Sequence, residues 1–315
     1  MNSTSVRAAT WLCLLAVVVL STPGTLVAEQ DLARNTSKNS RTKLVMLGTG
    51  NPSPNPDRFG PATVVLVDDV PYLIDAGVGV VRRWAAAIRV NNLSAKVLDL
   101  KTVFVTHLHT DHTLGLADVI FTPWTNEPSG SSGGVRPLEV YGPAGLTVMT
   151  DHLIAAYAED IRIRTSEGGS RNVAGGSGPI VKTHEITAGV VYRDDRVTVD
   201  AFHVPHGKWE HAFGFRVRTP DKVIVISGDT AFSPTIAEQC NGCDILVHEG
   251  GISDNSPYFR ESHTSAEELA RVAAAAKPKL LVLYHQRNAN GEGVRIIRSG
   301  FKGPVVVAND LQVFE

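Results

Sequence analysis

A cluster of metal-binding residue types directly after an apolar strand constrains this sequence most. Residues 103–106 are β-branched or aromatic and predict a short buried strand. Within the next six positions stand His107, His109, Asp111 and His112. Neutral imidazole and carboxylate are ligands that zinc prefers, and chance rarely groups four of them so closely. We therefore expect a metal site here, rather than a polar loop whose histidines are satisfied by hydrogen bonds.

The spacing within this cluster predicts two metal ions. His107 and His109 are two positions apart, so in extended backbone they point to the same side and can hold one ion. Asp111 and His112 follow on the turn and are offset, so they can hold a second ion. Gly115 then lets the chain bend away.

The composition is ordinary for a soluble globular protein with a sizeable core. The chain has 315 residues, of which 43% are hydrophobic and 20% charged, and its formal net charge is −2. A general nucleic-acid binder usually shows a basic face. The charge balance therefore argues against a nucleic-acid partner, although it leaves a local basic patch open.

The first 28 residues predict a secretory signal. Residues 1–10 carry one arginine and no acid, residues 11–20 are apolar, and Pro23 breaks the run before Ala28. This charged, apolar, small-residue order is typical of a cleaved export signal, and its apolar part is short for a membrane span. We predict a secreted or periplasmic protein cleaved near Ala28, with no other membrane contact. The alternative is a retained membrane anchor.

The rest of the chain divides into a lead-in and one domain. Residues 29–42 are largely polar and predict a flexible lead-in, and residues 43–315 predict a single domain. Within this domain, Cys240 and Cys243 are separated by Asn-Gly. In an exported chain a local disulfide and a pair of reduced, buried thiols are equally plausible. The pair lacks the partners of a zinc ribbon.

Apolar strands alternate with helices along the domain. Strands are expected at residues 43–48, 63–67, 72–77, 103–106, 138–142, 189–192, 197–202, 222–227, 244–248, 280–285 and 305–307. Helices are expected at residues 79–91, from 143 towards 160, from 234 onward, and up to 276 after a capping box that begins at Thr264. Polar residues repeatedly end the strands. This pattern predicts an α/β architecture whose site is built by loops at one edge.

Later strand ends offer the remaining ligands. His206 follows a strand beside proline and glycine, so we favour it over His203 and His211 as a metal ligand. Asp229 ends the next strand and is the natural bridging ligand, because one carboxylate can contact two cations and offset their repulsion. His285 ends a later strand and is assigned to the second metal.

Three other side chains are expected near the site. Asp75 ends a strand, and we expect it to brace the histidine loop by accepting hydrogen bonds, with a plain helix cap as the alternative. Trp209 and Phe213 could line an aromatic leaving-group pocket, although a buried core position is equally plausible for Phe213.

The order and spacing of these motifs resemble the metallo-β-lactamase superfamily from about residue 43 to the end of the chain. The resemblance implies a four-layer αββα sandwich with two zinc ions per chain at one edge; Mn²⁺ or Fe²⁺ is the alternative metal. It assigns the first zinc to His107, His109 and His206. It assigns the second to Asp111, His112 and His285, with Asp229 between the two.

Within that superfamily, the chain is similar to the arylsulfatase-like and ribonuclease Z-like branch. The stretch 247–249, followed by 262–265, resembles the proton-transfer pair of this branch. The resemblance therefore implies catalytic roles for Glu249 and His263 together with Asp111. The alternative for His263 is a histidine that only caps the turn at Thr264.

We expect an exported hydrolase that cleaves sulfuric or phosphoric esters of small molecules by attack of metal-bound hydroxide. Asp229 weighs against a β-lactam substrate, because true β-lactamases generally lack it. A charge-balanced excursion at residues 167–179 weighs against the tRNA-holding arm of ribonuclease Z. The alternatives are a ribonuclease Z-like phosphodiesterase that processes tRNA 3′ ends, a lactonase or β-lactamase-type hydrolase, and a non-catalytic zinc protein. A homodimer is left open.

Overall fold

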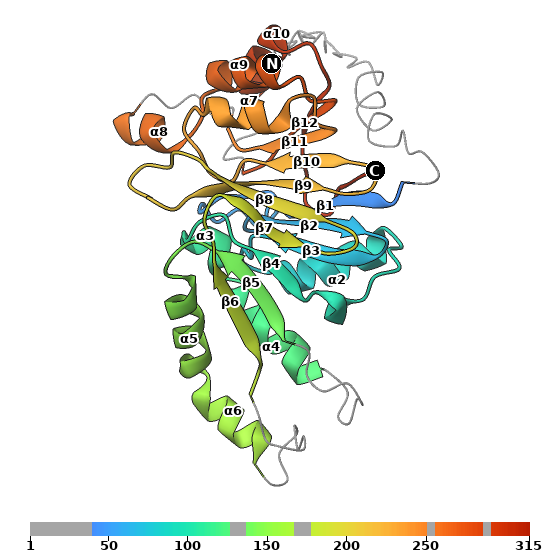
Figure 1. Ribbon diagram of the computed structural model, residues 1–315, viewed down its shortest axis with the longest axis vertical. Coiled ribbons are helices and arrows are strands. Elements are labelled where there is room, and N and C mark those ends of the chain that lie inside the picture. The colour runs from blue at the N-terminus through green and yellow to red at the C-terminus, as the bar shows by residue number, and fades with distance from the viewer. Residues whose placement is uncertain (1–39, 127–136, 167–177, 251–255, 286–290) are drawn as a thin grey trace, which may run out of the picture.

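The computed structural model describes residues 40–126, 137–166, 178–250, 256–285 and 291–315 (Figure 1). The predicted signal and nearly all of the predicted lead-in lie outside these residues, as does most of the excursion at 167–179. None of the described helices combines the length and apolar character needed to cross a membrane.

The described residues form two seven-stranded sheets that face each other (Figure 1). The first sheet runs in the order β14 (Val313–Phe314), β1 (Thr42–Gly48), β2 (Ala62–Val67), β3 (Val70–Ile74), β4 (Thr102–Phe104), β5 (Leu138–Gly142) and β6 (Val181–Glu185). The second runs in the order β13 (Val305–Val307), β12 (Leu280–Leu283), β11 (Ile245–His248), β10 (Val223–Ile226), β9 (Phe213–Arg218), β8 (Thr198–His203) and β7 (Gly189–Arg193).

Helices cover the outer face of each sheet and complete the four predicted layers. On the first sheet lie α2 (Val80–Val90) and α4 (Leu116–Asn126); on the second lie α7 (Pro234–Cys240), α9 (Ala266–Ala276) and α10 (Gly291–Gly300). Aromatic side chains such as Phe104 and Phe215 fill the space between the sheets. Trp84 of α2 packs between the helices and the first sheet, and Leu269 of α9 packs between the helices and the second sheet. The prediction of an αββα sandwich is therefore confirmed.

Burial explains why these segments form these elements. All six residues of β2 are buried. One face of its sheet packs on the other sheet and the opposite face packs on helices, so a strand inside the sheet is buried on both faces. In α2 the buried residues Val80, Trp84 and Ala87 recur at helical spacing, so one face of the helix packs on the sheet.

The parallel strands position the site. The strands from β3 to β6 pair in parallel, and so do those from β10 to β13. The carboxyl ends of parallel neighbours lie at the same edge of a sheet, so the loops that follow them come together. The short helix α3 (Thr110–Thr113) begins in the loop after β4.

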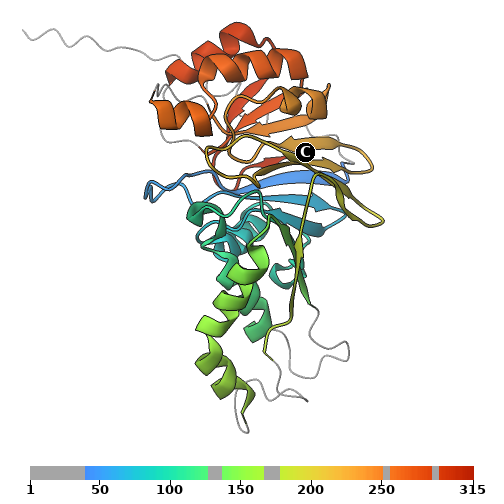
Figure 2. The ribbon, with the colours of Figure 1, turned by 60° about the vertical axis from the view of Figure 1, so that its left-hand side comes forward.

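The predicted helix from residue 143 towards 160 is two helices in the structure. They are α5 (Leu146–Ala156) and α6 (Ala158–Thr165), which extend away from the sandwich beside β6 (Figures 1 and 2). The sequence did not predict β6, because its residues are only partly buried or exposed and carry no apolar pattern. It also did not predict α4 or α8 (Pro257–Ser262).

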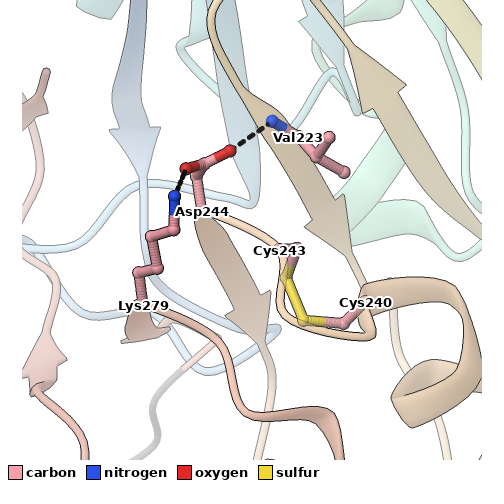
Figure 3. The surroundings of a disulfide bond; sticks show 5 residues. All are labelled: Val223, Cys240, Cys243, Asp244 and Lys279. Carbon is pink, nitrogen blue, oxygen red and sulfur yellow. Dashed lines mark hydrogen bonds and ion pairs between the residues drawn. A yellow bond between two sulfur atoms is a disulfide. The ribbon is translucent and has the colours of Figure 1, made fainter.

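Cys240 and Cys243 form a disulfide, which decides between the two alternatives for these residues (Figure 3). Both are buried, one at the end of α7 and the other just before β11. Asp244 follows, and its carboxylate accepts hydrogen bonds from the Val223 backbone N–H and from Lys279 Nζ, each at 2.7 Å. The disulfide and Asp244 thus fix the turn that enters β11.

Candidate metal centre

The first sheet supplies a contiguous part of the site. His107 follows β4, His109 is the N-cap residue of α3, and Asp111 and His112 lie in the first turn of this helix. His107 and His112 are fully buried. The predicted cluster therefore lies directly after the carboxyl end of β4, and its side chains at His107 and His112 point into the interior of the molecule.

The structure brings the predicted ligands together in two groups. In the first group the ligand atoms of His107, His109, His206 and Asp229 all lie within 4.8 Å of one another. His109 Nδ1 lies 2.9 Å from His107 Nε2 and 3.1 Å from His206 Nε2. Three imidazole nitrogens that converge in this way suit a single cation.

The second group contains Asp111, His112 and His285, within the same limit of 4.8 Å. Asp229 faces it as well: its Oδ2 lies 3.2 Å from His285 Nε2, and its Oδ1 lies 3.3 Å from His112 Nε2. Because Asp229 also belongs to the first group, its carboxylate lies between the two, as the sequence predicts for a bridging ligand.

The donor set fits divalent cations. Apart from their mutual contact at 3.3 Å, His112 Nε2 and Asp229 Oδ1 are buried and have no hydrogen-bond partner among the described residues. A buried polar atom without a partner costs free energy, so such atoms are expected to bind something else. Imidazole nitrogen and carboxylate oxygen are the ligands that zinc and related transition metals take.

Asp75 braces the histidine loop, as expected. One of its carboxylate oxygens accepts from the Thr106 backbone N–H at 2.8 Å, and the other accepts from His112 Nδ1 at 2.8 Å. The Thr106 hydroxyl also donates to Asp75, and it lies 3.0 Å from His107 Nδ1. Asp75 thus orients His112 directly and His107 through Thr106, which leaves Nε2 of both rings facing the site.

On the second sheet, a backbone carbonyl orients His206. Its Nδ1 donates to the carbonyl of Ser262 at 2.6 Å, which fixes the ring with Nε2 towards the first group. His203 and His211 belong to neither group, and the ring of His203 packs 4.7 Å from that of Phe213. The preference for His206 therefore agrees with the geometry.

Burial and charge shift the pKa values of the ligands in opposite directions. Burial holds the pKa of His107 well below its ordinary value, so this ring is neutral and can donate a lone pair. Burial also opposes charge on His112, but the carboxylates of Asp229 and Asp75 outweigh it and raise the pKa of His112 well above its ordinary value. The facing histidines His285 and His112 outweigh burial at Asp229 and lower its pKa.

Glu249 and His263 form the predicted pair beside the candidate metal ligands. His263 Nδ1 lies 3.2 Å from Glu249 Oε1, and Glu249 is fully buried. Burial lowers the pKa of His263, but the hydrogen bond and charge of Glu249 outweigh it and raise this pKa to about 9. Helix α9 is capped by Ser265, and His263 instead follows the end of α8, so the alternative role at the start of α9 does not describe it.

The two aromatic residues have separate roles. Trp209 is 36% exposed, and its Nε1 donates to His109 Nε2 at 2.8 Å, so it lies at the site. Phe213 is fully buried between the sheets. It is part of the core and does not line a leaving-group pocket.

Sequence reasoning missed three groups around the site. Thr106 stands next to His107, and that adjacency is a signal that could have suggested its role. Thr264 donates from its hydroxyl to the carbonyl of Thr230 at 2.7 Å, and the Ser262 carbonyl holds His206. A backbone carbonyl leaves no mark in a sequence.

Curated relatives of the chain are named ribonuclease Z. The protein of Mycobacterium marinum is 32% identical over 286 residues, which cover 87% of this chain and 98% of the relative. That of Mycobacterium tuberculosis strain H37Rv is 30% identical, with 87% and 97% covered. That of Mycobacterium sp. strain KMS is 34% identical over 252 residues, with 77% and 83% covered.

These relatives overturn two expectations. The chain was expected to be an arylsulfatase-like hydrolase of small-molecule esters, and a nucleic acid was expected to be an unlikely partner. Both are wrong, because the relatives carry the name of a ribonuclease. The net charge of a whole chain says nothing about its local fields. Most of the excursion that argued against an RNA-holding arm lies outside the described residues.

Solved structures agree on the fold. The short form of human tRNase Z superposes with a TM-score of 0.63 at 23% identity, covering 87% of this chain and 98% of that one. A metallo-β-lactamase fold protein of Bacillus subtilis superposes with a TM-score of 0.65 at 15% identity, covering 87% and 99%. A family model described as a β-lactamase superfamily domain matches residues 71–286. The chain therefore belongs to the metallo-β-lactamase superfamily, as a ribonuclease Z-like, metal-dependent hydrolase that acts on ester bonds.

Proposed function

We propose that this protein is a phosphodiesterase that cleaves RNA, with tRNA precursors as its substrate class. The observation that carries the proposal is the match to proteins named ribonuclease Z over 87% of the chain. The site supports it, since the Glu249–His263 pair lies beside both groups of ligands. A site that bound metal only for structure would have no use for a proton-transfer pair.

We also propose that the site holds two divalent ions, with zinc as the first choice. His107, His109 and His206 would hold one ion, and a second group of residues would hold the other: Asp111, His112 and His285. The Asp229 carboxylate would contact both. When bound, such a pair supplies a water of lowered pKa and stabilises the charge that grows on the phosphoryl oxygens.

The chain's own residues then perform the remaining steps. Asp75 and the Ser262 carbonyl keep the ligand rings oriented, so the site is formed before the substrate arrives. His263 Nδ1 is held by Glu249, so Nε2 is the nitrogen that can deliver a proton to the departing ribose oxygen. The raised pKa of His263 keeps this proton in place at neutral pH.

A substrate panel tests this proposal. The purified, zinc-loaded protein would be assayed with a precursor tRNA that carries a 3′ trailer, bis-nitrophenyl phosphate, nitrophenyl sulfate and a lactone. We expect cleavage of the precursor and of the phosphodiester. Failure to cleave the precursor, whatever the activity on the other three substrates, would refute the function. Metal analysis of the same material measures the identity and number of the ions.

Export and domain organisation are proposed separately, and an exported form would act on RNA other than the precursor tRNA made in the cytosol. A cleaved signal at residues 1–28, followed by one hydrolase domain from residue 43, remains a prediction from the sequence. The Cys240–Cys243 disulfide supports export, because such bonds persist mainly in oxidising compartments. N-terminal sequencing of the protein from fractionated cells tests this. An intact Met1 in the cytosolic fraction alone would contradict it.

A further inference from the structure

A cavity of about 630 Å³ opens beside the proton-transfer pair, between α8, α9 and α10. Its lining includes His263, Phe259 and Arg271, together with Ala274 from α9 and Ser299 from α10. Among the described residues, none of the predicted metal ligands lines the cavity, so it is distinct from the candidate metal centre and adjoins it at His263.

His263 links this cavity to the metal ligands. Its ring packs at 5.1 Å and 27° against Phe259, which lines the cavity, and at 6.0 Å and 24° against the ligand His285. Because Glu249 holds Nδ1, the proton available for transfer is on Nε2. A leaving oxygen must come within hydrogen-bond reach of that nitrogen. The group attached to this oxygen must therefore occupy space next to His263, which the cavity provides.

The lining suits a nucleotide better than a bare anion. Phe259 is buried, with its ring packed against His263, and gives the cavity an apolar wall. Arg271, whose guanidinium lies 5.1 Å from the centroid of the Phe232 ring, offers a cation for a phosphate. The side chain of Arg271 is 67% exposed, and its nearest acid, Glu268, is 3.8 Å away. Glu268 already accepts from the Ser265 backbone N–H in the capping box of α9. Glu267 and Arg260 also line the cavity, so its two acids match its two guanidinium groups, and a cluster of phosphates is disfavoured.

We infer that this cavity holds the nucleotide on the leaving side of the cleaved phosphodiester, an inference that rests on the proposed function. In the reaction, the oxygen of water forms a bond to phosphorus and the bond from phosphorus to the leaving ribose oxygen breaks. The proton on His263 Nε2 passes to that ribose oxygen. One product ends in a hydroxyl group, held in the cavity, and the other keeps the phosphate.

Filling the cavity from either wall tests the inference. Ala274→Trp fills it from α9 and Ser299→Trp from α10, whereas Ala275→Trp is the matched control: Ala275 is the exposed neighbour of Ala274 and lies outside the lining. The full-length, zinc-loaded proteins would be assayed on precursor tRNA and on bis-nitrophenyl phosphate, whose leaving group is no nucleotide. We expect the ratio of the two kcat/KM values to fall about tenfold in both filling variants, and to stay at the wild-type value in the control.

The outcomes separate the subsite from the function. If the wild-type protein cleaves RNA but the filling variants keep its ratio, or the control loses as much, the subsite is refuted and the function stands. If the wild-type protein cleaves bis-nitrophenyl phosphate and no RNA, the proposed function fails and the subsite fails with it. Thermal melting confirms that each variant is folded. Because the two filling variants lie on different helices, a folding defect in one leaves the other to decide.

Discussion

The two sheets contribute to the metal centre in different ways. The first sheet delivers His107, His109, Asp111 and His112 from one strand end and the helix that follows it. The second sheet delivers its ligands singly, from three loops spread between positions 206 and 285. One half of the site is therefore a local structure, whereas the other exists only after a sheet has formed.

The groups that orient the histidines also differ between the two halves. On the first sheet, a single carboxylate, Asp75, orients His112 directly and His107 through Thr106. On the second sheet, the support of His206 is a backbone carbonyl at the end of α8. The first half thus depends on one side chain that can be mutated, whereas the second depends on the position of a helix.

Removing the group shared by both halves should have the largest effect. Asp229→Ala takes away the carboxylate that faces both sets of ligands. We expect a loss of turnover of about a thousandfold or more, together with loss of bound metal. Bis-nitrophenyl phosphate hydrolysis and metal analysis measure both. Full metal content with normal turnover would show that the halves function without a shared ligand.

Changing the proton-transfer residue should affect chemistry and leave metal binding intact. We expect His263→Ala to lower turnover of RNA by about 100-fold to 1,000-fold, with unchanged metal content. Bis-nitrophenyl phosphate should lose less, because nitrophenolate leaves without a proton. Loss of metal in this variant would mean that His263 is a ligand, since it lies close to Asp229 and His285.

Substitutions of Asp75 and Glu249, which orient residues of the first and the second half, should differ in their effect on metal affinity. Asp75→Asn removes the charge that orients His112, and we expect metal affinity to fall about 10-fold to 100-fold. Glu249→Gln is the matched change on the second sheet and should lower turnover without weakening metal binding. Titration with zinc in competition with a chelator measures both affinities. Equal weakening in the two variants would contradict the difference between the halves.

The alkaline fall in RNA turnover should report on the protonation of His263, which belongs to the second half of the site. The pKa of His263 is raised to about 9, so the proton needed by the leaving group is present below that pH and is lost above it. Turnover of RNA should therefore fall as the pH rises through about 9, by up to tenfold per pH unit. In the Glu249→Gln variant the pKa of His263 should be lower, so the alkaline loss of activity should begin at a lower pH than in the wild-type protein. An unchanged alkaline limb in this variant would argue against the pair.

Opening the disulfide should have the smallest effect. Cys240 and Cys243 close a loop of only a few residues in the second half, far in sequence from the first. We expect the double variant Cys240→Ser/Cys243→Ser to lose about 2 kcal/mol of stability, with its activity retained. Chemical denaturation measures the loss. A variant that melts normally but no longer binds zinc would link this turn to the metal centre.

The same contrast explains what the sequence could predict. His107 to His112 lie together in the chain, so residue type and spacing alone predicted a metal site. Asp229 and His285 were found because each follows an apolar strand. The resemblance to the superfamily then assigned both residues to the same metal centre. The Ser262 carbonyl and the cavity beside His263 depend on where α8 packs, which no local pattern encodes. The substrate class was mispredicted because the charge balance of the whole chain and of the excursion at 167–179 was taken as evidence against an RNA partner.

The pairing of β1 has a consequence for how the chain matures. β1 lies between β2 and β14, and residues Leu44 and Val45 pair with Phe314 and Val313. A ribosome makes β14 long after it has made β1. The first sheet therefore stays open along one edge until residues 313–314 have emerged, and the nascent chain must be kept from pairing that edge with a neighbour.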